Sequence, residues 1–280
     1  MKDKLNKYAQ NVTSQHGEDG ILDYIIKSLE GKINTVCCEF GAWDGIFAST
    51  SNCYNLWHNK NWKTLLIEGD SEKYQDLISN TSKLDFVSTE CCLVKSKGVD
   101  SLDNILKRHN FPSNLGVLSI DIDSFDFHVW KRLKISKPQI VIIEHNLFIP
   151  PYIEYHDPED ETYLRCSAKS LEKLGKEKGY KLICCTLSNC IFIRGDLFDS
   201  NKFPDYPVEY LFDYSAIQSQ ILMTGVGDNR YPVLSKKISN SRKQLYKFYY
   251  KVQSMYKSNV IYTPPSENIK NNLKKFGLDA

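Results

Sequence analysis

The sequence predicts an α/β protein built on a doubly wound, mostly parallel sheet of seven strands. Short apolar runs alternate with amphipathic helical patterns over residues 35–195, and several of the runs are apolar on both faces. Such runs are typical of parallel strands that helices cover on both sides. The last two runs are separated by only two residues, which indicates an antiparallel hairpin at the end of the sheet.

Five apolar runs are expected to form the parallel part of the sheet. They are "TVCCEF", "KTLLIEG", "LDFVSTE", "GVLSIDI" and "QIVIIEH", at 35–40, 63–69, 84–90, 116–122 and 139–145. Between them, the segments 71–80 and 100–109 have helical periodicity and open with Ser or Asp, residues that cap helix N-termini. The order of strands and helices is therefore that of repeated βαβ units.

A long loop is expected after the fifth strand. Residues 147–165 hold three prolines and have no clear period, and long loops in compact domains are commonly functional. A helix is then predicted over 167–179, ending at Gly179, where a left-handed residue would close it. The runs 180–187 and 190–195 complete the sheet as the hairpin.

The length and composition suit one large domain with an appendage. The chain has 280 residues, of which 41% are hydrophobic, enough to bury a substantial core. We expect a domain over 1–199 and a Tyr- and Lys-rich extension over 200–280 with helical or irregular structure. Within that extension, residues 235–259 carry seven basic residues and no acid.

The charge and hydropathy exclude several classes of protein. The net charge is +2, from 36 basic and 34 acidic residues, so a nucleic-acid partner is not expected. No apolar run approaches the roughly 18 residues of a membrane span, and the N-terminus lacks the apolar core of a signal peptide, so a cytoplasmic location is expected.

Nine cysteines raise the question of disulfides or zinc. Six of them form the adjacent pairs Cys37–Cys38, Cys91–Cys92 and Cys184–Cys185 inside strand-like runs, and no Cys-x-x-Cys spacing occurs. Neighbours on a strand point to opposite faces, so we expect reduced core residues and no zinc site.

The stretch "CCEFGAWDG" at 37–45 is the first candidate binding element. Ligands of open α/β sheets lie outside the carboxyl ends of the strands, where this stretch is expected. Gly41 and Gly45 allow a tight turn, but Trp43 stands at the second glycine of the dinucleotide fingerprint Gly-x-Gly-x-x-Gly, which disfavours a nicotinamide oxidoreductase. Glu39, at the end of the strand, instead suits a ligand with cationic groups and hydroxyls.

A second acid follows the next strand. Glu68, in "LLIEGD", is placed to accept both hydroxyls of a ribose. An acid, a glycine turn and a second acid after the next strand form the pattern of a class I S-adenosylmethionine (SAM) site.

The chain resembles the FkbM-type family of SAM-dependent methyltransferases over about residues 13–195. The first motif of that family, acid-x-Gly-Ala-x-x-Gly, is matched by Glu39, Gly41, Ala42 and Gly45. The run "IDIDSFD" is similar to a second family motif at Asp121, Asp123 and Asp126, although Ser124 replaces its glycine, and "SQHGEDGI" looks like a subgroup hallmark. The resemblance implies a Rossmann-like class I methyltransferase that binds SAM through the first motif, Glu68 and Asp121.

Polar residues at the ends of the fourth and fifth strands predict a divalent-metal site. They are Asp121, Asp123, Glu144, His145 and Asn146. Hard oxygen ligands suit Mg²⁺ or Mn²⁺, which would help to deprotonate a hydroxyl acceptor. The arrangement is similar to that of metal-dependent O-methyltransferases. A plainer interpretation also stands, in which these acids hold the SAM amino group and cap helices.

His145 is the expected catalytic base, with Asp121 and Asp123 as further candidates. Its ordinary pKa of about 6.5 allows it to accept a proton near neutral pH. It could equally be a metal ligand. His128 lies within a helical pattern and is expected to be structural.

The resemblance implies hydroxyl acceptors of the sugar or polyketide type, and we expect a nucleotide-activated sugar of surface-polysaccharide biosynthesis. Candidate acceptor contacts are Gln15, His16 and Glu18 of the first helix, Tyr152 for stacking, and Arg165 for a diphosphate. The alternative is a SAM- or nucleotide-binding module without turnover, and a homo-oligomer is left open.

Overall fold

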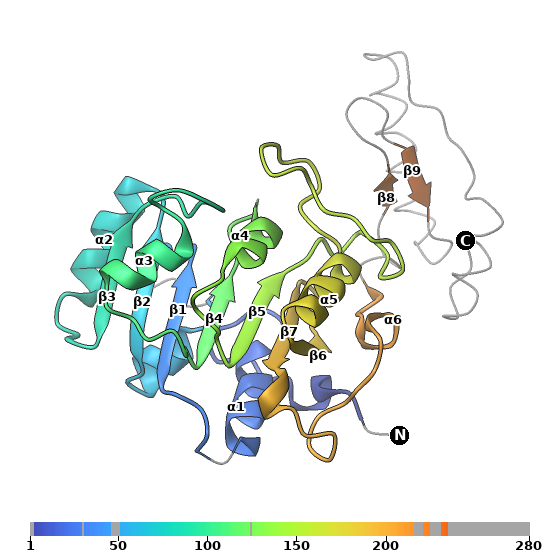
Figure 1. Ribbon diagram of the computed structural model, residues 1–280, viewed down its shortest axis with the longest axis horizontal. Helices are drawn as coiled ribbons and strands as arrows, with labels where there is room; N and C mark the ends of the chain where they lie inside the picture. Colours follow the sequence, from blue (N-terminus) through green and yellow to red (C-terminus); the bar gives the residue numbers. More distant parts are fainter. Residues whose placement is uncertain are drawn as a thin grey trace. The chain divides into compact units, whose positions relative to one another are not determined.

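The computed structural model describes residues 3–29, 31–45, 51–123 and 125–215 and the two short strands at 221–224 and 231–234 (Figure 1). The chain divides into two compact units. The first comprises Met1–Asn146 and Pro151–Phe212, and the second comprises Leu147–Pro150 and Asp213–Ala280. Residues 200–212 therefore cluster with the first unit.

The first unit contains one seven-stranded sheet in the order β3-β2-β1-β4-β5-β7-β6. The strands are β1 (Val36–Phe40), β2 (Lys63–Glu68), β3 (Val87–Cys91), β4 (Val117–Ile120), β5 (Ile140–Glu144), β6 (Tyr180–Cys185) and β7 (Asn189–Arg194). The first five strands pair in parallel, whereas β7 lies antiparallel between β5 and β6. The predicted doubly wound, mostly parallel sheet with a terminal antiparallel pair is confirmed.

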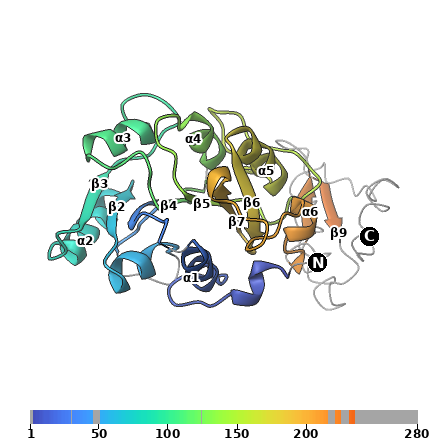
Figure 2. The same cartoon turned by 60° about the horizontal axis from the view of Figure 1, so that its bottom comes forward.

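Helices cover both faces of this sheet. They are α1 (Glu18–Ser28), α2 (Ser71–Thr81), α3 (Leu102–Arg108), α4 (Asp126–Arg132), α5 (Ala168–Glu177) and the short α6 (Val208–Leu211). Figure 2 shows α3, α4 and α5 on one side of the sheet and α1 on the other. Short helical turns at Leu5–Tyr8, Asn55–Asn59 and Gly195–Leu197 complete the set.

Local capping sets the ends of two helices. The Asp70 carboxylate accepts from the backbone N–H groups of Glu72 and Lys73, so the cap of α2 lies one residue before the predicted start. Ser167 caps α5, which ends close to Gly179, whose φ of +81° confirms the predicted glycine stop.

The core lies on both faces of the sheet because the strands are apolar on both sides. In β5, Ile140, Val141, Ile142 and Ile143 are all fully buried. Leu65, Leu66 and Ile67 of β2 are buried as well. This double burial is the physical reason for the continuous apolar runs in the sequence.

The cysteines are all free thiols, as expected, but one pair lies outside the core. Cys91 is exposed and Cys92 half-buried, which corrects the prediction for that pair. The reason is that β3 is an edge strand with only β2 beside it. Cys185 and Cys190 face each other across the hairpin with their Sγ atoms 3.8 Å apart, and both are fully buried.

In the second unit, β8 (Ile221–Thr224) and β9 (Tyr231–Leu234) form an antiparallel pair. The basic stretch 235–259 lies outside the described residues. Among the helices that the structure describes, none combines the length and apolarity needed to cross a membrane.

Candidate functional site

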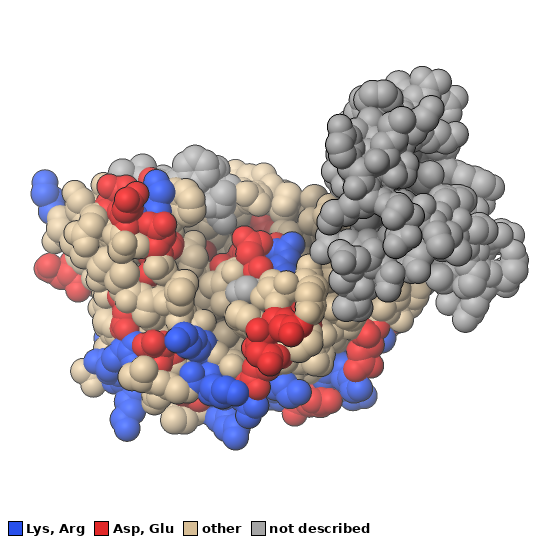
Figure 3. Space-filling model, turned by 90° about the horizontal axis from the view of Figure 1, so that it is seen from above, with Lys and Arg blue, Asp and Glu red and all other residues tan. Residues whose placement is uncertain are grey.

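A cavity of about 800 Å³ opens at the carboxyl ends of β1, β2, β4 and β5. The strand order reverses at β1, which has β2 on one side and β4 on the other, so the cavity lies at the switch point of the sheet. Figure 3 shows this edge of the sheet from above, with acidic and basic side chains lying against one another near the middle of the described surface.

The wall of the cavity includes about half of the residues that the sequence singled out. Those on the wall are Gln15, Glu39, Gly41, Glu68, Asp121, Asp123 and Glu144. The others do not line the cavity; they are His16, Glu18, Ala42, Gly45, His145, Asn146, Tyr152 and Arg165. The acids at the strand ends are thus brought together, whereas most of the residues expected to contact the acceptor are not on the wall.

The glycine turn after β1 packs too closely for any side chain at Gly41. Gly41 has a φ of +80°, and a Cβ atom there would lie 2.4 Å from the backbone oxygen of Asp121. The backbone N–H groups of Gly41 and Ala42 donate to the carbonyl of Ile67 in β2. Gly45 has a φ of +70°, and a Cβ atom there would meet Leu77 of α2 at 2.6 Å. The turn therefore joins β1, β2 and β4 at the cavity.

Glu39 lies on the cavity wall but is almost fully buried and already has hydrogen-bond donors. Its carboxylate accepts from the Ser51 hydroxyl at 2.5 Å and from the backbone N–H groups of Asn52 and Cys53 at 2.8 and 3.3 Å. Burial raises the pKa of Glu39, and these hydrogen bonds partly oppose that rise. Glu39 thus anchors the chain that returns toward the short helix at Asn55–Asn59.

The raised pKa of Glu39 predicts a pH-dependent effect of Glu39→Gln on stability. Because its pKa in the folded state lies above that in the unfolded state, Glu39 favours folding below its unfolded pKa. That contribution is lost as the pH rises through the folded pKa. The neutral Gln does not titrate, so the free energy of unfolding of the variant, relative to wild type, should be higher at pH 8 than at pH 4.5.

Urea denaturation at the two pH values measures this difference. Glu72→Gln, at an exposed position of α2, is the control and should show a smaller change with pH. An equal difference between Glu39→Gln and wild type at both pH values would contradict the expectation.

Glu68 is the last residue of β2. It lies on the side of the glycine turn opposite to Glu39. One of its carboxylate oxygens accepts from the backbone N–H of Trp43 at 2.7 Å, and the other accepts from that of Asp70 at 2.8 Å. A carboxylate oxygen has two acceptor positions, so each retains one for a ligand hydroxyl. Glu68 therefore both holds the glycine turn and faces the cavity.

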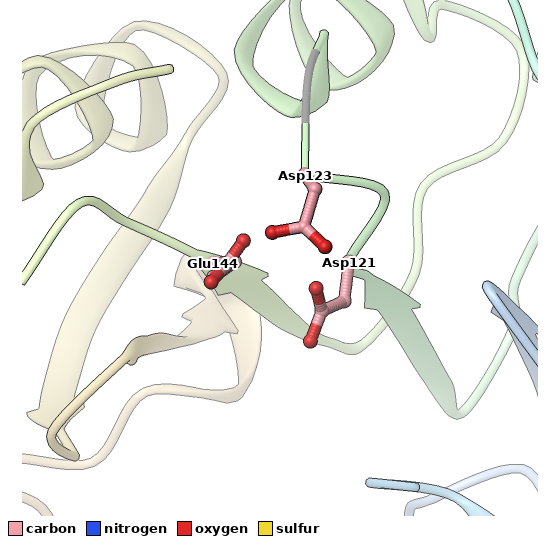
Figure 4. Close-up of side chains that lie close together, drawn as sticks. All are labelled: Asp121, Asp123 and Glu144. Carbon is pink, nitrogen blue, oxygen red and sulfur yellow. The ribbon is translucent and has the colours of Figure 1, made fainter. Parts of the chain in front are cut away.

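Three carboxylates gather at the ends of β4 and β5. Oxygen atoms of Asp121, Asp123 and Glu144 lie within 4.8 Å of one another, and Figure 4 shows the three side chains pointing toward a common point. Burial, and then the negative charge of Glu144, raises the pKa of Asp121. Burial raises the pKa of Glu144 to about 7, against the opposing effect of Arg165. We call Asp121, Asp123 and Glu144 the acid cluster.

Arg165 contacts the acid cluster directly. Its Nη1 donates to Asp123 Oδ1 at 2.7 Å and also to the carboxylate of Glu144. From the sequence, Arg165 was expected to bind a diphosphate. In the structure, its guanidinium pairs with the carboxylates of Asp123 and Glu144. The folding of the loop after β5 decides this contact, which leaves no sign in the sequence.

Asp157 organises that loop and was missed by the sequence analysis. Its buried carboxylate accepts from the backbone N–H groups of Tyr163, Leu164 and Arg165 and from the Tyr155 hydroxyl. His128 Nε2 lies 2.7 Å from the Asp157 carbonyl oxygen, which agrees with the structural role expected for His128. An Asp in a segment without periodicity gives no signal of such a role.

Glu18 lies buried between α1 and the β6–β7 hairpin. It is fully buried, and one carboxylate oxygen accepts from Thr186 Oγ1 at 2.6 Å and Asn189 Nδ2 at 3.0 Å. The other accepts from the backbone N–H of His16. Glu18 therefore ties α1 to the β6–β7 hairpin, and its predicted contact with the acceptor stays a prediction.

His145 and Asn146 follow Glu144 but do not line the cavity. The His145 ring is 1% exposed, and its centroid lies 5.3 Å from that of Phe212. Asn146 Nδ2 donates to the carbonyl of Leu164, so its amide supports the loop after β5. Because successive side chains of a strand point to opposite faces of the sheet, Glu144 and His145 lie on opposite sides of it.

The chain is similar to solved methyltransferase structures. The CMeT domain of the citrinin polyketide synthase is 10% identical, with 63% of this chain and 51% of that chain covered and a TM-score of 0.41. The CurJ carbon methyltransferase is 10% identical, with 63% and 52% covered and a TM-score of 0.42. A SAM-dependent methyltransferase from Clostridium acetobutylicum is 10% identical, with 62% and 90% covered and a TM-score of 0.40.

This chain spans about half the length of the first two of these proteins. No protein-family model and no curated protein matches the sequence.

Proposed function

We propose that the protein is a SAM-dependent methyltransferase. The observation that supports this most is the cavity at the switch point, where the glycine turn lies between Glu39 and Glu68. Its volume of about 800 Å³ is in the range of small-molecule sites. The acids on its wall suit the positively charged sulfonium and the amino group of SAM, and they would oppose a pyrophosphate.

The residues of the cavity divide between cofactor and acceptor. Glu68 accepts the ribose hydroxyls, and the glycine turn lets the backbone approach the cofactor closely. Asp121 lies beside the turn and would hold the SAM amino group. Asp123 and Glu144 would face the acceptor.

Replacing Glu68 tests the cofactor site. Glu68→Gln removes a charged acceptor from the ribose diol, so SAM affinity should fall about tenfold to a hundredfold. Calorimetric titration with SAM measures this, and Glu72→Gln on α2 should bind as wild type does. Since Glu68 also holds Trp43 and Asp70, a melting curve must show that the variant is folded. Unchanged SAM affinity in folded Glu68→Gln would remove Glu68 from the site.

We propose a sugar hydroxyl as the acceptor, on a nucleotide-activated sugar for surface polysaccharide. The FkbM-type resemblance supports this class, and so does the presence of carboxylates where the acceptor proton must leave. In the transfer, the acceptor oxygen forms a bond to the methyl carbon, the carbon–sulfur bond breaks, and the hydroxyl proton passes to a basic group. S-adenosylhomocysteine is the second product, and its formation with sugar nucleotides as acceptors tests the class.

The acid cluster fits a divalent cation by its chemistry. Three carboxylates from two neighbouring strand ends are donors of the kind that Mg²⁺ and Mn²⁺ prefer. We propose that Asp121, Asp123 and Glu144 hold such an ion, which when bound lowers the pKa of a coordinated hydroxyl. The side chain of Asn146 donates through Nδ2 to the carbonyl of Leu164. The position of His145 does not support a direct role as the base.

A further inference from the structure

The guanidinium of Arg165 occupies the side of the acid cluster that a metal ion would need. It donates to Asp123 and to Glu144 from the same Nη1 atom, so it lies between two of the three carboxylates. A bound Mg²⁺ requires carboxylate oxygens at about 2.0 to 2.1 Å in octahedral geometry. Coordination of a metal by these carboxylates would compete with the hydrogen bonds that Asp123 and Glu144 accept from Nη1 of Arg165. The two cations would also repel each other strongly at that separation.

The backbone at Arg165 is held from both sides by one residue. The Asp157 carboxylate accepts from the Arg165 N–H at 2.6 Å, and the Asp157 N–H donates to the Arg165 carbonyl at 2.8 Å. Arg165 has a φ of +64°, a left-handed conformation that is unfavourable for a side chain of this size. These contacts hold the residue in a conformation that directs it to the acid cluster.

The same loop is also fixed at its neighbours. Asn146 donates to the Leu164 carbonyl and, through its backbone N–H, to the Cys166 carbonyl. The Ser167 N–H donates to the Tyr155 carbonyl. Arg165 therefore reaches the acid cluster from an ordered frame, and of its two partners Glu144 is largely buried whereas Asp123 is exposed.

We propose that Arg165, positioned by Asp157, is an intramolecular counter-ion that competes with a divalent cation for the acid cluster and so sets the affinity of the site for that cation. This inference rests on the proposed function, because it assigns a regulator to the same site. Cation binding displaces the guanidinium from Asp123 and Glu144. Metal binding must therefore break the Arg165 ion pairs, and the free energy lost with them makes metal binding less favourable.

Mn²⁺ binding to the full-length protein tests the proposal without substrate or turnover. Arg165→Met removes the charge and keeps an unbranched apolar side chain. Charge-assisted hydrogen bonds to two carboxylates are lost, so the variant should bind Mn²⁺ about tenfold to a hundredfold more tightly than wild type. The fall of the free Mn²⁺ signal in electron paramagnetic resonance gives the dissociation constant directly.

Arg108→Met is the matched control. Arg108 also pairs with two carboxylates, Glu90 and Asp100, but neither of them belongs to the acid cluster. Arg108→Met removes the same positive charge from the protein as Arg165→Met. It therefore separates a local effect on Mn²⁺ affinity from the effect of the net charge. Its Mn²⁺ affinity should stay within about threefold of wild type, as expected for a partly screened distant charge.

Asp157→Asn tests the positioning role. The amide keeps the size of the carboxylate but loses acceptor capacity for the N–H groups of Tyr163, Leu164 and Arg165. Mn²⁺ affinity should rise to a value between those of wild type and Arg165→Met. A wild-type affinity in Asp157→Asn would overturn the role of Asp157.

Three results would overturn the role of Arg165: equal Mn²⁺ affinity in Arg165→Met and wild type, no Mn²⁺ binding by either, or an equal rise in Arg108→Met. SAM titration of the same samples separates this inference from the proposed function. Normal SAM binding with unchanged Mn²⁺ affinity rejects only the inference. Absent SAM binding with the expected rise in Mn²⁺ affinity rejects only the cofactor assignment.

Discussion

Asp123→Asn combined with Glu144→Gln is expected to lower kcat by about 10² to 10⁴ while leaving SAM affinity within about threefold of wild type. The two carboxylates lie at the acceptor end of the cavity, so their loss removes the groups that hold a cation and receive the hydroxyl proton. Glu39 and Glu68 remain for the cofactor. Initial rates of S-adenosylhomocysteine formation and calorimetric titration with SAM measure the two quantities.

EDTA should reproduce the loss of activity in the wild-type protein, and added Mn²⁺ should restore it. Glu154→Gln with Asp205→Asn is the control, because both acids form exposed ion pairs with lysines on the protein surface. Exposed pairs of this kind contribute little, so kcat should not change. Full activity in EDTA would show that the acid cluster works without a metal. An unchanged kcat in the double variant would remove both acids from catalysis.

Gly41→Ala is expected to destabilise the protein by about 2 to 5 kcal/mol and to abolish measurable SAM binding. The left-handed backbone costs a Cβ-bearing residue about 1 to 2 kcal/mol, and forcing a methyl group against neighbouring atoms costs about 1 to 3 kcal/mol more. The new Cβ would lie 2.4 Å from the Asp121 backbone oxygen, so β1 and β4 must separate at the cavity. Urea denaturation gives the free energy of unfolding.

Gly98→Ala isolates the backbone cost. Gly98 has a φ of +88°, and a Cβ atom there would have no neighbour within 4 Å. Its loss of stability should be about 1 to 2 kcal/mol, with SAM binding unchanged. If both variants lose the same stability, or if Gly41→Ala binds SAM as wild type does, close packing of the turn does not shape the cofactor site.

The sheet could be predicted from the sequence because its strands obey a local rule. Strands covered on both faces must be apolar on both faces, so β2, β4 and β5 were visible as continuous runs. The stop of α5 near Gly179 and the turn at Gly41 were visible because only glycine adopts such backbones freely. The convergence of Asp121, Asp123 and Glu144 followed from the parallel order of β4 and β5.

The exposure of Cys91 could not be predicted from the apolar pattern of its strand. It depends on which strand lies at the edge of the sheet, and β3 is at the edge only because the chain reverses its winding at β1. The buried position of Glu18 likewise depends on the β6–β7 hairpin, which lies about 170 residues away in the chain and supplies the donors Thr186 and Asn189.

Periodicity predicts the strands, backbone freedom predicts the glycine turn, and the parallel order of β4 and β5 predicts that their terminal acids converge. The contacts that those acids make depend on segments distant in the sequence. Glu144 faces the cavity while His145 packs against Phe212, and Asp157 folds its loop so that Arg165 reaches Asp123 and Glu144. Contacts of this kind join segments with no shared period, and their geometry exists only once the loop after β5 has folded against the sheet.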